Sequence, residues 1–378
     1  MRKRVLATLL AAGMVMGSLA GCGNSDSGSS DSGSKEAETT KEAETKTDDA
    51  ADDAAGDEAA ASGDLAEVLG DITMVIANRD EFLSEMESGA IKAAETLGVK
   101  MTTVDAQNDQ SKLLQFVETA KNNDQKVIIV NPVDAAADAC QQIVDAAGDM
   151  KVVFVNRPPD DIDAGSKVLN ENVVYVGSDE MTSGYFQGQA LSEYFKEQGK
   201  TDIKYILIQG TLGQVSTTNR TASLLKAFED NGINAEEATS PLVADWDRAT
   251  AQDMITPLLT TIEYDCIVGN CDALSLGAIE AMKSQGLDPS SVPIVGIDAT
   301  TDGRQAIHDG DMYMTVFQNA AGQGYGAMKA AANLVQGKPA NDGTEWELDE
   351  TGCIVWIPFE PVNLDNVDTY DNYTLNIE

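Results

Sequence analysis

From residue 72 onward, short apolar segments alternate with amphipathic segments of helical length. A strand that is apolar on both faces must be covered on both faces, and an intervening helix lets the chain return to start a parallel neighbour. The pattern therefore predicts an α/β fold with parallel sheets and helices on both faces. The expected strands are 72–77, 100–105, 127–130, 152–155, 173–176, 203–209, 233–240, 266–268 and 292–297, and the expected helices lie near 80–97, 109–122, 134–147, 180–198, 216–230, 247–261 and 273–285.

The length of this region favours two lobes rather than one. Roughly 310 residues is more than a single hydrophobic core usually holds. We therefore expect two doubly wound parallel-sheet lobes.

Polar side chains end corresponding strands in the two halves of the chain. Asn131 and Asn270 each follow an apolar strand, and an aspartate able to cap the next helix comes shortly after each. One strand later, Asn156 in the first half and Asp298 in the second half again end apolar strands. Ligands of open α/β sheets bind outside the carboxyl ends of the strands. If the lobes face each other across those ends, these groups converge on one cleft.

The first residues have the pattern of an export signal. Arg2, Lys3 and Arg4 precede an apolar run that is too short for a membrane span, and Leu-Ala-Gly-Cys22 follows. The last four residues closely resemble a bacterial lipobox. We expect residues 1–21 to be a lipoprotein signal peptide and lipid on Cys22 to anchor the protein to the outer face of the cell membrane. The alternative is a plain signal peptide with an incidental cysteine.

Residues 22–68 are expected to form an acidic, disordered tether. Residues 23–64 contain no aromatic residue and no aliphatic residue larger than alanine, and their 13 acidic and 3 basic residues give a net charge of −10. Such a segment cannot bury enough apolar surface to offset chain entropy, and like charges extend it. The net charge of the whole chain, −38, argues against nucleic acid or an anionic lipid surface as a partner.

The sequence offers few of the residues that nucleophilic or metal-dependent catalysis needs. His308 is the only histidine and lies near the end of an expected helix, where a cation interacts well with the helix dipole. Cys140, Cys266, Cys271 and Cys353 fit no zinc or disulfide spacing. We expect neither an enzyme nor a bound metal or cofactor, although counting carboxylates alone leaves a glycosidase open.

Nine short segments, in order along the chain, carry a resemblance to a known family. They are 76–82, 130–134, 155–159, 174–179, 219–220, 245–247, 270–273, 295–298 and 316–318. Together they resemble the type I periplasmic sugar-binding proteins of ABC importers, above all the glucose/galactose- and ribose-binding proteins, from about Asp71 to the C-terminus.

The resemblance implies two lobes joined by a three-strand hinge, with the ligand in the cleft between them. Periplasmic binding proteins close such a hinge around their ligands. The expected crossovers lie near 156–158, 318–320 and 354–360. The first lobe would then comprise residues 69–156 and 319–355, and the second lobe residues 157–318 and 356–378.

A pyranose suits a slot with aromatic rings on its C–H faces and planar polar groups around its rim. Phe82 and Trp246 resemble the aromatic pair of the family, although Phe82 could instead be a core residue. The other expected ligand-binding residues are Asp80, Asn131, Asn156, Arg157, Gln214, Ser216, Arg220, Cys271, Asp298 and Gln318. Simpler alternatives are a helix cap for Asp80, turn residues at Asn131 and Asp298, and a solvated helix arginine for Arg220.

Gln214, Ser216 and Cys271 depart from the glucose/galactose pattern, which has histidine, aspartate and asparagine there, and the calcium loop of that pattern has no counterpart. We expect a monosaccharide with a polar group fewer, or differently oriented, than glucose has on the second-lobe side, such as a pentose or a deoxy or epimeric sugar. The expected partners are the permease subunits of an ABC importer, and the expected state is monomeric. Alternatives are a sensor that presents the sugar to a chemoreceptor or histidine kinase, and a polyol or nucleoside-like ligand.

Overall fold

The computed structural model describes residues 65–160, 162, 165–371 and 373. The export signal, Cys22 and residues 23–64 of the expected tether lie outside these residues. The expected end of the tether at residue 68 is wrong. Residues 65–69 are helical, with Leu69 in the first-lobe core and Leu65 and Ala66 packed against it.

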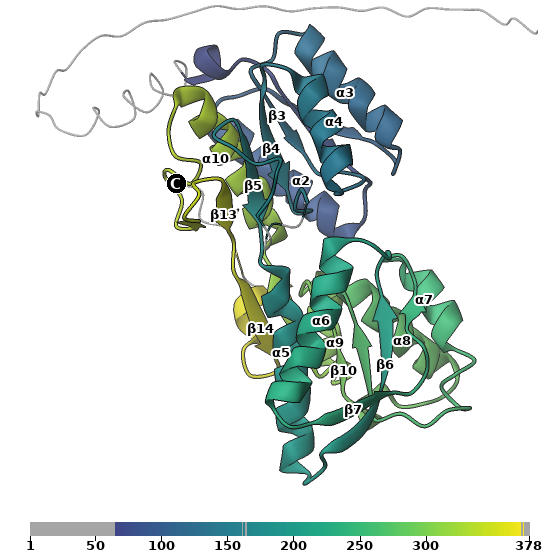
Figure 1. The fold of residues 1–378 in the computed structure, drawn as a ribbon. Coiled ribbons are helices and arrows are strands. Elements are labelled where there is room, and N and C mark those ends of the chain that lie inside the picture. The colour runs from purple at the N-terminus through teal and green to yellow at the C-terminus, as the bar shows by residue number, and fades with distance from the viewer. Residues whose placement is uncertain (1–64, 161, 163–164, 372, 374–378) are drawn as a thin grey trace, which may run out of the picture. The chain divides into compact units, whose positions relative to one another are not determined.

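The described residues form two α/β lobes, as expected (Figure 1). The sheet of the first lobe has the strand order β12-β13-β5-β4-β3-β1-β2, parallel except where β12 pairs with β13. Its strands are β1 (Ile72–Ile76), β2 (Met101–Asp105), β3 (Val127–Val130), β4 (Lys151–Val155), β5 (Val173–Gly177), β12 (Glu347–Leu348) and β13 (Ile354–Trp356). Its helices are α2 (Glu81–Thr96), α3 (Gln110–Asn122), α4 (Ala137–Ala147) and α10 (Ala320–Gln336).

Alternating side chains of the same strand supply two separate cores in this lobe, because successive residues of a strand point to opposite faces. Met74 and Ile76 of β1 belong to the core beneath α2 and α10, which pack against each other. Val75 between them belongs to the core beneath α3 and α4. This double burial explains the uninterrupted apolar strands of the sequence.

The sheet of the second lobe has the order β14-β11-β10-β9-β6-β7, with β8 also paired to β6. It is parallel except for β14, which runs antiparallel to β11. Its strands are β6 (Asp202–Gln209), β7 (Asn234–Glu237), β8 (Leu242–Val243), β9 (Cys266–Gly269), β10 (Ile294–Val295), β11 (Met314–Gln318) and β14 (Phe359–Asn363). The helices are α5 (Glu180–Glu197) and α6 (Val215–Asp230) over one core, α7 (Arg248–Ile255), α8 (Asp272–Ser284), α9 (Thr301–His308) and α11 (Val367–Asp371) over the other, and the 3-10 helix η1 (Pro289–Ser291).

The chain passes between the two sheets at residues 177–180, 318–320 and 356–359. The first crossover was expected near 156–158, and that boundary is wrong. β5 pairs in parallel with β4 and with β13, so residues 157–177 belong to the first lobe. That expectation came from the family resemblance, and the described residues between β4 and β5 contain no helix.

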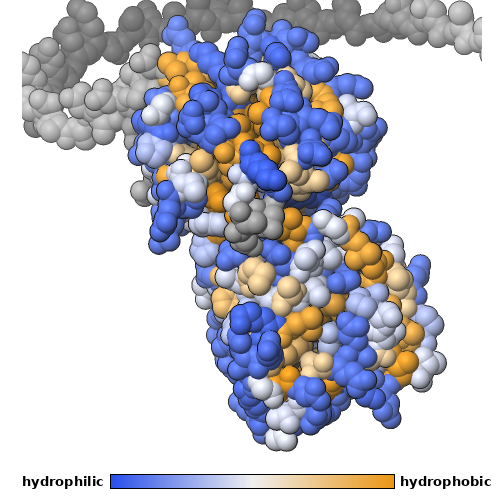
Figure 2. Space-filling view, viewed as in Figure 1, coloured by the Kyte–Doolittle hydropathy of each residue, from blue (hydrophilic) through white to orange (hydrophobic). Residues whose placement is uncertain are grey.

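Hydrophilic residues cover most of the visible face of the described residues, with apolar residues showing between them (Figure 2). No helix among the described residues is both long and apolar enough to span a bilayer. Cys140, Cys266, Cys271 and Cys353 are buried free thiols, so buried side chains rather than bridges between these cysteines hold the two lobes together.

Candidate ligand-binding site

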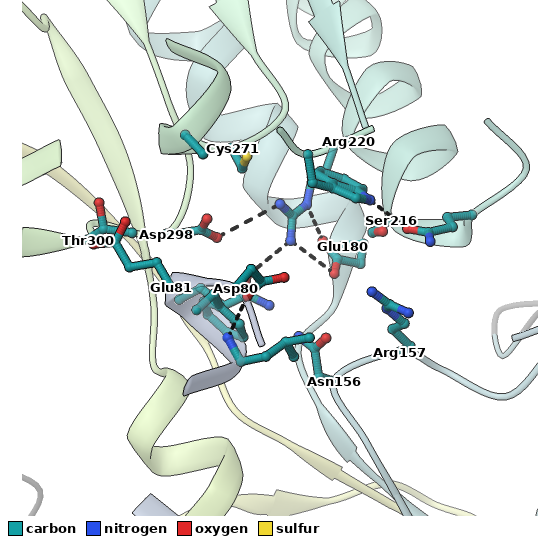
Figure 3. Close-up of a pocket in the computed structure, with 16 residues that line it drawn as sticks. Asp80, Glu81, Asn156, Arg157, Glu180, Ser216, Arg220, Cys271, Asp298 and Thr300 are labelled. Carbon is teal, nitrogen blue, oxygen red and sulfur yellow. Dashed lines mark hydrogen bonds and ion pairs between the residues drawn. The ribbon is translucent and has the colours of Figure 1, made fainter. Parts of the chain in front are cut away.

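Residues of both lobes line one cavity, which holds about 660 Å³ of space, part of it open to solvent (Figure 3). The first lobe contributes Asp80, Glu81, Phe82, Leu83, Asn156 and Arg157. The second contributes Glu180, Gln214, Ser216, Arg220, Trp246, Cys271, Ala273, Asp298, Thr300 and Gln318.

All the expected ligand-binding residues line this cavity except Asn131. The side chain of Asn131 is fully buried behind it. Its Oδ1 accepts a hydrogen bond from Ala77 N (3.3 Å), and its Nδ2 donates to Val155 O (3.1 Å) and Asn156 Oδ1 (3.2 Å). Asn131 therefore does not line the cavity as expected, and its side chain instead orients Asn156.

Arg220 of α6 is held by acceptors from three other elements. Its Nε and Nη2 donate to the two carboxylate oxygens of Glu180 at 2.7 and 3.2 Å. Nη2 also donates to Gln318 Oε1 (3.1 Å), and Nη1 donates to the carbonyl oxygen of Asn270 (2.7 Å). Only 5% of the Arg220 side chain and 3% of the Glu180 side chain are exposed. A charge buried this deeply needs such partners, so Arg220 is not a solvated helix arginine.

The same guanidinium contacts elements next to all three crossovers. Glu180 opens α5 directly after the first crossover, and Gln318 ends β11 directly before the second. The ring of Phe359, which opens β14 after the third crossover, lies 5.9 Å from Arg220 Cζ. Because Arg220 also lines the cavity, a rearrangement of the crossovers would move a side chain of the site.

Asp298 follows β10 in a strained backbone conformation, with φ at 119°. Its backbone N–H donates to Val316 O (2.7 Å), and its Oδ1 lies 4.0 Å from Arg220 Nη1. Burial raises the pKa of the Asp298 carboxyl well above its usual value, and Arg220 only partly offsets this. Although burial by itself lowers the pKa of Arg220, the carboxylate of Glu180 holds that pKa above its usual value.

Asp272, the first residue of α8, supports this wall of the cavity from behind. Its carboxylate accepts hydrogen bonds from Thr300 N (2.8 Å) and from the hydroxyls of Thr300 and Thr315. Burial raises its pKa to about 7 despite these donors. Asp272 thus positions Thr300, which lines the cavity, and it does not line the cavity itself.

Trp246 stands in an unusual backbone conformation that aims its ring at the site. The φ angles of Asp245 and Trp246 are 51° and 66°, in the left-handed region that few non-glycine residues adopt. Trp246 Nε1 donates to Gln214 Oε1 (2.8 Å). A Cβ on Gly210 would collide with the indole, so this glycine makes room for the ring. Gln214 is therefore both a lining residue and the hydrogen-bond acceptor that orients Trp246.

On the first-lobe side, Asp80 serves as the N-cap of α2, as the simpler alternative suggested. Its Oδ1 accepts from Leu83 N (2.8 Å) and its Oδ2 from Asn78 Nδ2 (3.2 Å). Arg157 Nη1 donates to the carbonyl oxygen of Pro132 (3.0 Å). Both side chains line the cavity in addition to these structural contacts.

Two amide groups near the site keep a donor without a partner among the described residues. They are Gln318 Nε2 and Asn270 Nδ2, both buried. An unpaired buried donor costs free energy, so such groups are typical of a site that completes its hydrogen bonds with a ligand. Gln318 lines the cavity directly.

Sequence reasoning missed five lining residues, namely Glu81, Leu83, Glu180, Ala273 and Thr300. Glu180 is the important omission, because it is the partner of Arg220. It follows the N-cap residue Asp179, where an acidic side chain normally interacts only with the helix dipole. Its burial was the missing signal, and local sequence does not reveal burial of a carboxylate.

His308 lies outside the cavity. It is the last residue of α9, as expected, and its Nε2 lies 2.6 Å from Asp371 Oδ2. Asp368 completes a group that could share a cation, but Arg304 already pairs with Asp371 at 3.0 Å and the group is exposed.

Comparisons with known proteins identify the family of the chain. Residues 72–339 match the family model described as the periplasmic binding protein domain. The D-galactose/methyl-galactoside binding periplasmic protein MglB of Haemophilus influenzae is 32% identical over 307 residues, which cover 77% of this chain and 88% of that protein. A putative rhizopine-binding protein of Rhizobium meliloti is 31% identical over 294 residues, covering 76% of this chain and 88% of that protein.

A solved structure is similar to most of this chain as well. An ABC transporter solute-binding protein of Bacillus halodurans with bound myo-inositol superposes with a TM-score of 0.68 at 28% identity, covering 80% of this chain and 97% of that structure. These relatives are binding proteins rather than enzymes. The expected family resemblance and the expected fold class are therefore confirmed. The chain belongs to the periplasmic binding protein domain family, with the two-lobed type I fold of the sugar-binding proteins.

Proposed function

We propose that this protein captures a monosaccharide or a closely related ring polyol outside the cytoplasm and delivers it to an ABC importer. The observation that carries the proposal is the cavity itself. Two aromatic side chains, Phe82 and Trp246, line it together with carboxylate, amide and guanidinium groups from both lobes. A hydroxylated ring offers apolar faces and polar edges that match such a lining.

A cyclitol stands beside the monosaccharides as a candidate ligand. The Bacillus halodurans structure holds myo-inositol, whereas the Haemophilus influenzae relative is named for galactosides. The two classes share a ring of hydroxyls and differ in the ring oxygen and the exocyclic carbon. The cavity lining supports both.

The proposed mechanism is capture without chemical conversion. A ligand bound between the lobes contacts residues of both only when they are close together, so it stabilises closure through its differential affinity for the closed state. Arg220, Glu180 and Gln318 connect the site to the first two crossovers and Phe359 connects it to the third, so binding and hinge position are coupled. The permease subunits would recognise the closed form. A receptor or histidine kinase that recognised it would make the same protein a sensor.

Lipid on Cys22 would hold the protein at the outer face of the membrane, with residues 23–64 as the tether. The support is the signal pattern of the sequence and the acidic, apolar-poor composition that follows it. A tether raises the effective concentration of the protein at the importer.

The direct test is isothermal titration calorimetry of the full chain against monosaccharides, cyclitols, linear polyols and nucleosides. We expect at least one ring polyol to bind with a Kd of about 10 μM or tighter, and Trp246→Ala to abolish that binding. Small-angle scattering should show a smaller radius of gyration with the ligand bound. Absence of binding across the monosaccharides and cyclitols would contradict the proposal, and conversion of the ligand during incubation would contradict capture without chemistry.

A further inference from the structure

The charges around the cavity do not cancel. Two guanidinium groups, Arg157 and Arg220, line it, and so do four carboxylates, Asp80, Glu81, Glu180 and Asp298 (Figure 3). A ligand is attracted or repelled mainly by those charges that no neighbouring group already compensates, and the six groups differ in this respect.

The charge of Arg220 is already matched by Glu180. Glu180 takes both Nε and one Nη2 hydrogen in a bidentate pair, and Gln318 and Asn270 take two more donors. The remaining Nη1 hydrogen is the only donor of Arg220 left for a ligand or for Asp298. An anionic group would therefore find little uncompensated positive charge at Arg220.

The charge of Arg157 acts mainly on the first-lobe side. Its Nη1 donates to two backbone carbonyls, of Pro132 (3.0 Å) and Val133 (3.4 Å), and its Nη2 lies 3.5 Å from Asn78 Oδ1. Burial lowers the pKa of Arg157, and the carboxylate of Asp80 raises it. Arg157 and Asp80 thus offset each other across that part of the cavity.

Asp298 is left without a full partner. Among the described residues its one ion pair within 4.0 Å is the contact with Arg220, which Glu180 has already neutralised. The side chain is 10% exposed, so little water screens it. Three further carboxylates, Asp272, Asp80 and Glu180, raise the pKa of Asp298 in addition to its burial, so a cation bound beside Asp298 would lower that pKa and favour the charged carboxylate.

Glu81 adds a second negative charge at the exposed rim of the cavity. Burial and then Asp302 raise its pKa, whereas Arg248 lowers it. Arg248 is itself paired with Glu280 (2.6 Å) and Asp302 (2.7 Å). The rim therefore carries no spare cation to balance Glu81 among the described residues.

We propose that the site selects its ligand by charge: it binds a ring polyol that carries a protonated amino group more tightly than the neutral parent, and it rejects the parent that carries a carboxylate. Asp298 is the acceptor for the ammonium group, and Glu81 adds attraction at the rim. Glu180 is the residue that sets this selectivity on the second-lobe side, because it cancels the charge of Arg220, which would otherwise attract an anion. This inference rests on the proposed function and narrows the class of ligand.

The test uses the full chain and matched series of ligands in calorimetry. The series are D-glucose, D-glucosamine and D-glucuronate; D-galactose, D-galactosamine and D-galacturonate; and myo-inositol with an aminodeoxy-inositol. In at least one series we expect the amine to bind about 10- to 100-fold tighter than its parent, as a charge-assisted hydrogen bond would give. The uronates should bind more weakly than their parents.

For each variant we compare the affinity for the amine with the affinity for its neutral parent. Loss of a residue with a merely structural role would weaken both ligands alike and leave this ratio unchanged. Asp298→Asn should reduce this ratio to near one, Glu81→Gln should reduce it by a smaller factor, and Glu118→Gln on the exposed face of α3 should leave it unchanged. Glu81 lies at the rim, so its variant keeps the proposal falsifiable if Asp298→Asn fails to fold.

The outcomes separate this inference from the proposed function. If neutral rings bind and the amines bind no tighter, or the uronates bind best, the charge selection is wrong and ring-polyol capture stands. An unchanged ratio in Asp298→Asn would likewise overturn the role of Asp298. If no member of any series binds, the proposed function fails and this inference fails with it.

Discussion

Arg220→Ala should destabilise the fold as well as weaken ligand binding. An arginine that only faced a ligand could be removed with little effect on stability. Arg220, however, is paired with Glu180 through hydrogen bonds of 2.7 and 3.2 Å, and Glu180 is 3% exposed. Removal of one partner leaves the other as an uncompensated charge in the interior, and such changes cost about 3–5 kcal/mol.

A loss of this size should lower the melting temperature by about 5–8 °C in a folded region of roughly 310 residues. Urea unfolding of the ligand-free protein, followed by circular dichroism, gives the free energy of unfolding directly. The double variant Glu180→Leu with Arg220→Met removes both charges and keeps the volume, so it should recover most of the lost stability. Affinity should stay lost in both variants.

Lys226→Ala is the matched control, because Lys226 lies on the same helix and pairs with Asp230 at 2.9 Å on the exposed face. It should not change the urea midpoint measurably, since exposed pairs contribute little. If Arg220→Ala unfolds at the same urea concentration as the unaltered protein, the Glu180–Arg220 pair is not buried as described. If the double variant is no more stable than Arg220→Ala, an unpaired Glu180 is not the cause of the loss.

Cys22→Ala should release the protein from membranes in a lipoprotein-exporting host and leave ligand affinity unchanged. If cell fractionation still finds this variant firmly bound to membranes, lipid on Cys22 is not the anchor. Cys271→Asn replaces a buried, weakly donating thiol at the cavity with an amide that can both donate and accept hydrogen bonds. Calorimetry should then show about 3- to 10-fold tighter binding of D-glucose. An unchanged affinity for D-glucose would show that the thiol is not what weakens its binding. Burial raises the pKa of Asp272 to about 7, whereas the same carboxyl in the unfolded chain loses its proton near pH 4. Between about pH 4 and pH 7 the folded state therefore holds a proton that the unfolded state does not, so the free energy of unfolding should fall as the pH rises over this range. In melting curves, Asp272→Asn should show a smaller change of melting temperature with pH over the same range. Gly210→Ala places a methyl group against the indole of Trp246, so binding should weaken at least tenfold while the melting temperature changes by only a few degrees, and an unchanged Kd would show that the ring does not need its present position.

The local pattern of the sequence was enough to predict the two parallel-sheet lobes and the polar residues that end their strands, whereas most of the predicted cavity lining came from the family resemblance. Apolar strands alternate with helices, and the residue that ends a strand lies at a definite edge of the sheet. Asn156 and Asp298 could therefore be placed from their position after β4 and β10. The family resemblance added residues such as Trp246 and Gln318, whose roles no local periodicity indicates.

Only the tertiary structure decided which strands pair and which polar groups are satisfied. β5 joins the first sheet through its pairing with β4 and β13, because strand pairing depends on non-local hydrogen bonds that the order of elements does not specify. Asn131 and Asp298 both end apolar strands, yet Asn131 finds three partners behind the cavity whereas Asp298 faces the cavity itself. Glu180 and Arg220 are 40 positions apart, and each by itself is an ordinary charged helix residue. Their burial against each other, which sets the charge that a ligand meets, arises only when α5 and α6 pack together.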